Sequence, residues 1–333
     1  MDGKNKDEIQ HPSNDGPPSF PKEFNGLSVQ IVFDGAGRPI PVVEVDGVKW
    51  PLPFIQHLVP GGNILEHLDM IKNMAIQDDD IMLCTYPKSG THWIWEIVSM
   101  LLKGKAEYEK KVKETAMLEF GSKDELKSIR SPRIFNTHLP VRMLPREITE
   151  KKKKIIHVQR NPKDVVVSLY NHIKAAMLGG DRSSSATMGT FSDMFPLLVS
   201  GGINNQWHVY VEELEKFTID NPDYPILTLN YEDMKEDPKR EIIKVANFLG
   251  IHYTPELIDD VQDKCDFENL KKANEDIKDD ITKKLSKDGK QFMYRKGQVG
   301  DWKNWFTVAQ NEEFDQLYIE WMSGSNLKFR FTL

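Results

Sequence analysis

A loop of small hydroxyl residues and glycine separates two apolar segments of the chain. Lys88, Ser89, Gly90 and Thr91 follow the apolar run DIMLCTY, and the tryptophan-containing segment HWIWEIVSMLLKG begins directly after them. Where a strand leads through such a loop into a helix, the free backbone N–H groups and the positive end of the helix dipole can face one anion. The loop is therefore a candidate phosphate cradle, although an ordinary strand-to-helix connection has the same composition.

This loop differs from that of a P-loop nucleoside triphosphatase. The glycine expected at the start of a Walker A motif is missing, and the lysine precedes the central glycine. No acidic residue stands out as a magnesium ligand, which a kinase would need. A P-loop nucleotide kinase is therefore the less favoured interpretation, and we expect no metal site.

An arginine ends the apolar run IIHVQR further along the chain. Arg160 stands at that end, and Ser168 follows eight residues later inside a predicted helix. An arginine at the carboxyl end of a buried strand points into the crevice where α/β proteins bind ligands, and its guanidinium group suits a phosphate. The alternative is a structural ion pair between Arg160 and Asp164.

Two more cations stand near the C-terminus. Arg295 and Lys296 precede Gly297, whose missing side chain lets the backbone approach an anion closely. A solvated surface turn is the ordinary interpretation of such a tripeptide. Three cationic groups in one acidic chain nevertheless favour a polyanionic ligand.

The composition places these cations in an acidic background. The chain has 333 residues, a formal net charge of -7 and 39% hydrophobic residues, so it has no general attraction for nucleic acid or anionic membranes. It shows neither the apolar region of a signal peptide nor a membrane-spanning run. We therefore expect a cytoplasmic protein in which Cys84 and Cys265 are free thiols.

Strands alternate with helices over most of the chain. The apolar patterns predict strands at 80–86, 133–138, 155–160 and 225–234, and helices at 92–104, 162–177 and 237–250. This alternation is typical of an α/β fold. We expect a single domain with a central parallel sheet flanked by helices and a strand-loop-helix like that of P-loop kinases.

Three regions fall outside this pattern. Residues 1–25 are charged and proline-rich, which predicts a disordered tail. Residues 26–78 are expected to form an N-terminal arm, with a hairpin turning at Asp34 to Gly37 and a helix over 63–75, packed on the main domain of residues 79–333. The Gly- and Ser-rich stretch 179–202 is a candidate lid, or else a partly helical surface insertion.

Four segments resemble one protein family. The segments are TYPKSGTHW, RNPKDVVVS, YEDMKEDPKREI and RKGQVGDWKNWFTVAQNE. They are similar, in order, to the motifs of the cytosolic sulfotransferases, which use 3'-phosphoadenosine 5'-phosphosulfate (PAPS) and release 3'-phosphoadenosine 5'-phosphate (PAP). The resemblance implies transfer of a sulfuryl group to the hydroxyl of a small lipophilic acceptor, such as a phenol, a steroid or another alcohol.

The resemblance also implies roles for individual residues in binding the nucleotide. The 5'-phosphosulfate loop corresponds to Lys88, Ser89, Gly90, Thr91 and His92, and the adenine contacts correspond to Trp93, Tyr231 and Phe267. The 3'-phosphate site corresponds to Arg160, Ser168, Arg295, Lys296 and Gly297.

The catalytic histidine of the family matches His138, in the segment NTHLP. In that role it would take the proton of the acceptor hydroxyl, while Lys88 would stabilise the charge that develops on the leaving phosphate. Sulfuryl transfer, like phosphoryl transfer, depends mainly on positioning and charge stabilisation. Without the resemblance, His138 would be interpreted as a structural histidine.

Two positions depart from the family pattern. His92 stands where many members have threonine or asparagine, which suggests the hypothesis that the loop is pH-sensitive. Asn136 stands where phenol- and estrogen-type members have lysine, so a second catalytic lysine is in doubt.

The same resemblance predicts a homodimer. KNWFTVAQNE is similar to the family's short dimerisation motif, which corresponds to Lys303, Thr307, Val308 and Glu312. The residues from Thr307 to Gln310 also form a capping box, so a purely structural role is the alternative.

The acceptor pocket is the least constrained part. Candidate lining residues are Trp50, Phe54, Met117, Phe120, His172 and Met177, for each of which core packing is the alternative. A non-catalytic nucleotide-binding protein of the same fold remains the main alternative function. Golgi sulfotransferases are disfavoured, because the sequence shows no membrane anchor.

Overall fold

The computed structural model describes residues 20–177, 188–275 and 293–333, and its centre is a four-stranded parallel sheet. The strands are β6 (Ile81–Thr85), β7 (Ile134–Thr137), β8 (Lys154–Gln159) and β9 (Ile226–Asn230), in the order β7-β6-β8-β9. The predicted α/β fold with a central parallel sheet is confirmed. The predicted strand over 225–234 is too long, because helix α9 (Tyr231–Glu236) begins where β9 ends.

The residues of strand β6 show that the sheet is buried on both faces. All five of its residues are buried. Ile81 and Leu83 belong to the apolar cluster on one face, whereas Met82 and Cys84 belong to the cluster on the other. Successive side chains of a strand point to opposite faces, so a strand covered on both sides needs a continuous apolar run.

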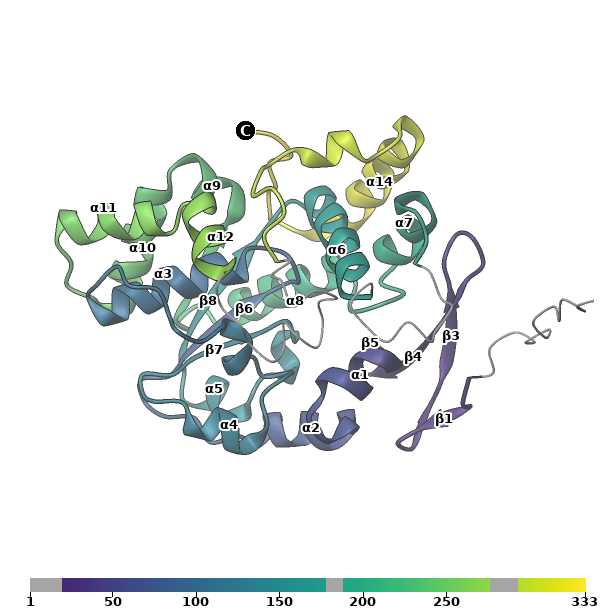
Figure 1. Cartoon of the computed structure of the whole chain (residues 1–333), viewed down its shortest axis with the longest axis horizontal. Helices are drawn as coiled ribbons and strands as arrows, with labels where there is room; N and C mark the ends of the chain where they lie inside the picture. The colour runs from purple at the N-terminus through teal and green to yellow at the C-terminus, as the bar shows by residue number, and fades with distance from the viewer. Residues whose placement is uncertain (1–19, 178–187, 276–292) are drawn as a thin grey trace, which may run out of the picture.

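Two groups of helices cover the sheet (Figure 1). One face packs against α3 (Thr91–Lys103), α9, α10 (Pro238–Leu249), α11 (Pro255–Lys264) and α12 (Phe267–Glu275). The other packs against α1 (Leu52–Leu58), α2 (Ile64–Lys72), α4 (Lys123–Ser128) and α5 (Arg146–Glu150). Helices α6 (Pro162–Met177), α7 (Phe191–Val199), α8 (Trp207–Asp220) and α14 (Val308–Trp321) share two further apolar clusters. Short 3₁₀ turns occur at η1 (Pro60–Gly62), η2 (Lys113–Ala116), η3 (Val141–Met143), η4 (Asp301–Asn304) and η5 (Met322–Gly324).

The predicted helix ends agree closely with the structure. Helix α3 starts after Gly90 and stops at Gly104, which adopts the left-handed conformation with φ of 63°. Helix α10 starts after Asp237, whose side chain accepts from the Arg240 N–H, and stops at Gly250. Polar residues commonly cap the start of a helix, and glycine in the left-handed conformation commonly follows its end.

The N-terminal arm forms more structure than predicted. Its antiparallel sheet has the order β3 (Gln30–Phe33), β4 (Pro39–Val45), β5 (Val48–Pro51), so the predicted hairpin extends to a third strand. Ahead of it, β1 (Glu23–Phe24) pairs with β2 (Leu27–Ser28). The expectation of disorder is therefore wrong for residues 23 and 24, and residues 1–19 lie outside the described residues.

The expected lid contains a packed helix. Residues 191–199 of the stretch 179–202 form α7, and its apolar residues, among them Phe191, Phe195 and Leu198, are buried. Residues 178–187 lie outside the described residues. The described part is thus partly helical, as the alternative expected, but α7 is packed in the core rather than inserted on the surface, because its apolar residues bury one face.

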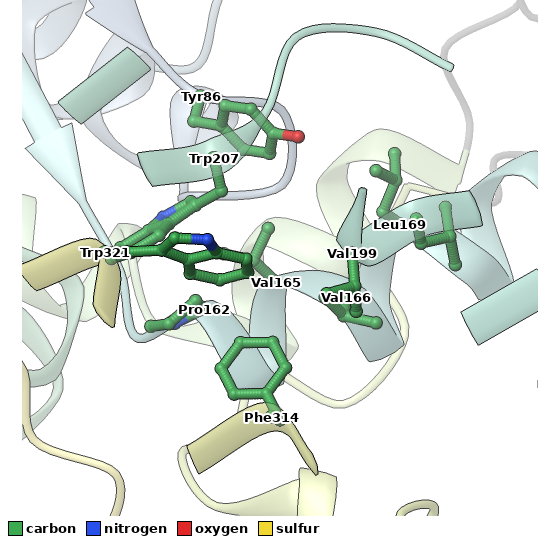
Figure 2. Close-up of a pocket in the computed structure, with 10 residues that line it drawn as sticks. Tyr86, Pro162, Val165, Val166, Leu169, Val199, Trp207, Phe314 and Trp321 are labelled. Atoms are coloured by element: carbon green, nitrogen blue, oxygen red, sulfur yellow. The ribbon is translucent and has the colours of Figure 1, made fainter. Parts of the chain in front are cut away.

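A small cavity lies among these helices (Figure 2). It is lined by residues such as Val165 and Leu198 together with Trp207, Phe314 and Trp321. Its free volume is about 10 Å³, which is room for one water molecule at most. We interpret it as imperfect packing rather than as a binding site.

Candidate active site

The carboxyl ends of the four parallel strands bring together residues that are far apart in sequence. Lys88 follows β6, His138 follows β7, Arg160 follows β8 and Tyr231 follows β9. Strand β7 lies on one side of β6 and β8 on the other, and the carboxyl edge of a parallel sheet at such a switch point is where α/β proteins usually bind ligands. All the sequence-predicted site residues of these four loops therefore share one region.

The loop after β6 has a tightly constrained backbone. Lys88 has φ of 70°, and Gly90, which caps α3, has φ of 111°. A side chain at Gly90 would bring its Cβ atom within 3.0 Å of the Tyr231 ring. Ser89 is fully buried, and its hydroxyl has no hydrogen-bond partner in the described part of the chain. The first N–H groups of α3 have no partner within the helix either, so the loop presents several donors for one anion.

Lys88 is partly buried and lies beside a histidine. Its Nζ lies 3.4 Å from Nδ1 of His172, which the sequence placed in the acceptor pocket. Burial and the nearby charges of Lys113 and Arg160 lower the pKa of Lys88 to about 7. Burial and the Lys88 charge hold the pKa of His172 well below its usual value. The neutral imidazole is thus a suitable acceptor for the Lys88 ammonium group.

His138 is held in one orientation by the neighbouring strand. Its Nδ1 lies 2.8 Å from the carbonyl oxygen of Thr85, which can only accept a hydrogen bond. The proton therefore sits on Nδ1, and Nε2 keeps its lone pair. Burial, followed by the charge of Lys113, lowers the pKa of His138 to about 3. A neutral imidazole with a free Nε2 has the form that a general base requires.

Two further contacts connect His138 to its surroundings. Its backbone N–H donates to Oε1 of the buried Glu119 at 2.5 Å, and burial raises the pKa of Glu119 to about 7. The Thr85 hydroxyl lies 2.7 Å from that of Thr91 and 3.3 Å from Nδ1 of His138. Thr85 thus links the start of α3 to the histidine.

Arg160 contacts three segments of the candidate site. Its guanidinium group donates to the carbonyl oxygens of Lys88 at 3.1 Å and Gln298 at 3.0 Å, and it lies 4.1 Å above the Tyr231 ring. Its Nε is buried without a partner among the described residues. Ser168 lies on α6 and is half-buried.

Asp164 mainly binds backbone groups rather than Arg160. Its carboxylate accepts the N–H of Gly300 at 2.7 Å and that of Trp302 at 3.0 Å, while Arg160 is 3.8 Å away. The alternative of a dominant Arg160–Asp164 ion pair is therefore not favoured. Asp164 instead fixes the segment 293–302 against α6.

The cations of that segment share one carboxylate. Arg295 and Lys296 each lie 2.6 Å from an oxygen of Asp301. Burial acts to raise the pKa of Asp301, but the hydrogen bonds from Lys296 and other residues lower it to about 2. Gly297 has φ of 63°, and a Cβ atom there would come 2.2 Å from the Phe267 ring. Gly297 and Phe267 are thus in direct contact.

The predicted adenine contacts lie on neighbouring elements. The ring centroids of Trp93 and Tyr231 are 5.6 Å apart, edge to face. The ring of Phe267 lies 6.1 Å from that of Tyr294, which in turn is 5.7 Å from His92. Aromatic faces suitable for a base are therefore present beside the phosphate loop.

Sequence reasoning missed a buried ion-pair chain. Lys113 and Glu114 of η2 are each only 4% exposed. Nζ of Lys113 lies 3.0 Å from Oε1 of Glu114 and 3.4 Å from Oδ1 of Asn136. The same Glu114 oxygen is 3.1 Å from Nε2 of His92. Lys113 and Glu114 belong to the charged run EYEKKVKET, in which no local signal indicates burial.

The candidate acceptor residues divide into three groups. The rings of Trp50, Phe54 and Phe120 form a series with centroid distances of 5.7 Å for each neighbouring pair. Trp50 belongs to the main apolar cluster, whereas Phe54 and Phe120 are partly exposed. Met117 is 3% exposed and bridges to Asn136 beside β7. Met177 is the last residue of α6, and its side chain lies outside what the structure describes.

Other types of site are not evident in the described ranges. No group of three His, Cys, Asp or Glu side chains in residues 20–177, 188–275 and 293–333 is arranged to hold a metal ion. No helix within the same ranges is long and apolar enough to cross a membrane. Cys84 and Cys265 are buried free thiols, as the sequence predicted.

Comparison with known proteins gives a consistent set of matches. Residues 78–326 match the family model of the sulfotransferase domain. Sulfotransferase 1A1 of Mus musculus is 35% identical over 301 residues, which cover 87% of this chain and 97% of the relative. Sulfotransferase 1C2 of Rattus norvegicus is 33% identical over 303 residues, covering 88% and 96%.

Solved structures have the same fold. The crystal structure of mouse sulfotransferase SULT7A1 complexed with PAP matches with a TM-score of 0.65 and 26% identity, covering 86% of this chain and 95% of that one. Retinol dehydratase in a complex with retinol and PAP matches with a TM-score of 0.68 and 18% identity, covering 87% and 92%.

Proposed function

The chain belongs to the cytosolic sulfotransferase family, and on this basis we propose that it transfers the sulfuryl group of PAPS to a small lipophilic hydroxyl acceptor. The acceptor class is a phenol, a steroid or another alcohol. The observation that carries the proposal is the orientation of His138. Its Nδ1 is bound to the Thr85 carbonyl oxygen, which leaves Nε2 free to accept the proton of an attacking hydroxyl.

The residues present fit the nucleotide. Buried polar atoms without partners in the described ranges include Ser89 Oγ, Arg160 Nε and Arg295 Nε, and such atoms are costly unless a ligand satisfies them. Gly90 and Gly297 leave no room for a side chain beside Tyr231 and Phe267.

Each residue of the nucleotide site has a proposed partner. The residues for the 5'-phosphosulfate are Lys88, Ser89, Gly90, Thr91 and His92. Those for the 3'-phosphate are Arg160, Ser168, Arg295, Lys296 and Gly297, and those for the adenine are Trp93, Tyr231 and Phe267.

The mechanism follows from the chemistry of the two catalytic residues. When bound, PAPS supplies the sulfuryl group and a phosphate leaving group. His138 accepts the acceptor's proton at Nε2, so that the oxygen becomes nucleophilic as it attacks. Lys88 stabilises the negative charge that develops on the leaving phosphate. Thr85 fixes the tautomer of His138 through its carbonyl oxygen.

The proposed acceptor side is apolar. Phe54 and Phe120 lie 5.7 Å apart and are partly exposed, and Met117 lies on the segment that flanks β7. Apolar and aromatic walls with a few polar groups are typical of sites for small lipophilic ligands. We propose that these three side chains contact the acceptor.

We also propose that the enzyme is a cytoplasmic homodimer. The proposed contact residues are Lys303, Thr307, Val308 and Glu312. Thr307 forms a capping box with Gln310 at the start of α14, and the neighbouring Val308 is 76% exposed. The capping role and the dimer contact are therefore compatible.

A transfer assay tests the proposed function. Purified protein is incubated with ³⁵S-labelled PAPS and a panel of phenols, steroids and other alcohols. We expect label transfer to at least one acceptor, and a reduction of kcat by at least about 100-fold in His138→Ala, because general-base catalysis typically contributes 10² to 10⁴. PAP affinity should stay near that of the wild type.

Controls distinguish the alternatives. His252→Ala, at an exposed position just after the end of α10, should keep full activity. PAP binding without transfer to any acceptor would favour the non-catalytic nucleotide-binding protein. Phosphate transfer from ATP and Mg²⁺ would favour the kinase.

A further inference from the structure

A buried lysine that neither the family motifs nor the proposed mechanism uses lies beside the catalytic strand. Lys113 is 4% exposed. Its Nζ contacts Glu114 Oε1 at 3.0 Å, Asn136 Oδ1 at 3.4 Å and Met117 Sδ at 3.9 Å. A lysine is almost never buried to this extent without a specific partner, so the position is structurally specified.

Hydrogen bonds attach the segment 113–120 to β7 and to His138, which directly follows β7. Asn136 Nδ2 donates to the carbonyl oxygen of Lys113 at 2.8 Å, and the Leu118 N–H donates to the carbonyl oxygen of Asn136 at 3.0 Å. The His138 N–H donates to Glu119 at 2.5 Å. Asn136 and Lys113 thus bind each other twice, through the amide nitrogen and the amide oxygen.

Asn136 connects this segment to the catalytic histidine. Asn136 and His138 are two residues apart along the same extended stretch, so their side chains leave it on the same side. The Lys113 ammonium group, which contacts Asn136, therefore lies on the side of β7 from which His138 projects. At the other end, Glu114 contacts His92 on α3, so the ion pair spans from the phosphate helix to the catalytic strand.

We propose that Lys113 is a positioning residue for sulfuryl transfer, which holds the segment 113–120 against β7 and places a fixed positive charge beside His138. Phenol- and estrogen-type family members have a lysine at the position of Asn136. In this chain the ammonium group of Lys113, on η2, contacts the Asn136 side chain instead. This proposal rests on the general-base role proposed for His138.

The charge has a predictable effect on the base. The titratable groups that act on His138 are Lys88 in the phosphate loop, Lys113 and Glu114 on η2, Glu119 after η2, and His172 on α6. His92 on α3 contacts Glu114 of this group. Burial lowers the pKa of His138 most, and the charge of Lys113 lowers it next, whereas Glu114 raises it with a smaller effect. Lys113 therefore keeps the imidazole neutral at lower pH than it would otherwise be.

The test compares two substitutions with opposite expected signs. The pH profile of kcat/KM for the acceptor is measured at saturating PAPS. Its acid limb reports the pKa of the base in the nucleotide complex. In Lys113→Met, of similar length and without charge, this limb should move to higher pH by about one unit. In Glu114→Gln it should move to lower pH. Lys113→Arg keeps the charge and should keep the wild-type limb.

A second measurement does not require turnover. The ¹³C-histidine Cε1–H resonance of His138, assigned by its loss in His138→Ala, is titrated by NMR with and without PAP. It should titrate at higher pH in Lys113→Met. Lys154→Met is the matched control. Lys154 is the first residue of β8, at the amino end of the parallel strands and away from the site, and it binds the Leu249 carbonyl oxygen.

The outcomes separate this proposal from the proposed function. A His138 titration that does not move in Lys113→Met, with the acid limb also unchanged, would overturn the role of Lys113 even if the enzyme is active. Lower stability or kcat with an unmoved titration would assign Lys113 a structural role only. A shifted titration in a protein without transfer activity would support the charge placement and refute the proposed function.

Discussion

At the residue scale, the candidate active site contains an excess of basic groups. Lys113 and Arg160 are buried and Lys88 is partly buried, and Glu114 is the carboxylate in contact with Lys113. Charges of the same sign in a buried site disfavour one another's ionisation. Burial, followed by these neighbouring charges, lowers the pKa of Lys88 to about 7, which implies that an anionic ligand restores the proton.

We therefore predict that PAP binding takes up protons. Free Lys88 loses its proton as the pH rises through about 7, and a bound phosphate raises its pKa again. Above that pH, binding must include protonation, so the affinity for PAP should fall by up to about tenfold per pH unit. Calorimetry at pH 8 in buffers of different ionisation enthalpy should detect uptake of close to one proton.

The ligand and a second variant control this measurement. The second ionisation of a phosphate monoester is near pH 6, so PAP itself contributes little at pH 8. Lys88→Met should remove the uptake, and Lys154→Met should keep it. His92 contributes only at lower pH, because burial lowers its pKa despite Glu114. Equal uptake in wild type and Lys88→Met would contradict the assignment.

The residues that sequence could predict stand at strand ends. Lys88, His138 and Arg160 each follow an apolar run, and parallel strands bring such positions to one edge. Lys113, Glu114 and Glu119 were not predictable, because a charged run has the same local pattern whether it is solvated or paired in the interior. Their burial depends on contacts with Asn136 and His138, which lie about 20 residues further along the chain.

At the element scale, the main sequence error concerns boundaries. The run PILTLNYEDM reads as one strand, yet Tyr231 begins α9. No Gly or Pro separates the two elements, so local propensity could not locate the change. The early start of α9 matters for the site, because the Tyr231 ring lies against Gly90 and Arg160.

Asp164 on α6 holds the C-terminal segment in place, and its substitution gives the second prediction. In Asp164→Asn, an amide N–H₂ replaces one oxygen that accepts from Gly300 or Trp302. A buried donor then faces a donor, which costs about 1–3 kcal/mol of the free energy of unfolding. Because this segment carries Arg295 and Lys296, PAP affinity should fall about tenfold, or 1.4 kcal/mol, with little change in the acceptor's KM.

Denaturant unfolding and PAP titration measure the two effects. Asp259→Asn is the control, since Asp259 is an exposed residue that pairs with Lys239 on the surface. It should change neither quantity by more than about 0.5 kcal/mol. Wild-type PAP affinity in Asp164→Asn would show that the backbone contacts of Asp164 do not position the segment.

At the scale of the whole molecule, the N-terminal arm completes the main domain. Val43, Trp50 and Ile55 of the arm belong to the same apolar cluster as Met82 and Phe135 of the central sheet. The sequence predicted the hairpin from its turn and an arm packed on the main domain, but it could not predict which residues share this cluster, because they are far apart in the chain. The arm also contributes Phe54, on α1, to the proposed acceptor side.

The surface of α14 provides the last prediction, which concerns the oligomeric state. Val308 is 76% exposed at the first turn of α14, directly after the capping residue Thr307. If this surface forms the dimer, Val308→Glu places two like charges near the two-fold axis without disturbing the monomer core. Sedimentation at micromolar concentration should then show a dimer for the wild type and a monomer for Val308→Glu, with an unchanged melting temperature for the monomer.

Ile319 supplies the matched control, because it is also apolar, lies on the same helix and is 64% exposed. Ile319→Glu should remain dimeric if the contact is confined to the start of α14. Loss of the dimer in both variants would place the interface along the whole helix, and a monomeric wild type would remove the dimer altogether. The test must leave Thr307 intact, because its hydroxyl accepts the Gln310 N–H at 3.1 Å and its loss would destabilise α14 by about 1 kcal/mol regardless of any partner.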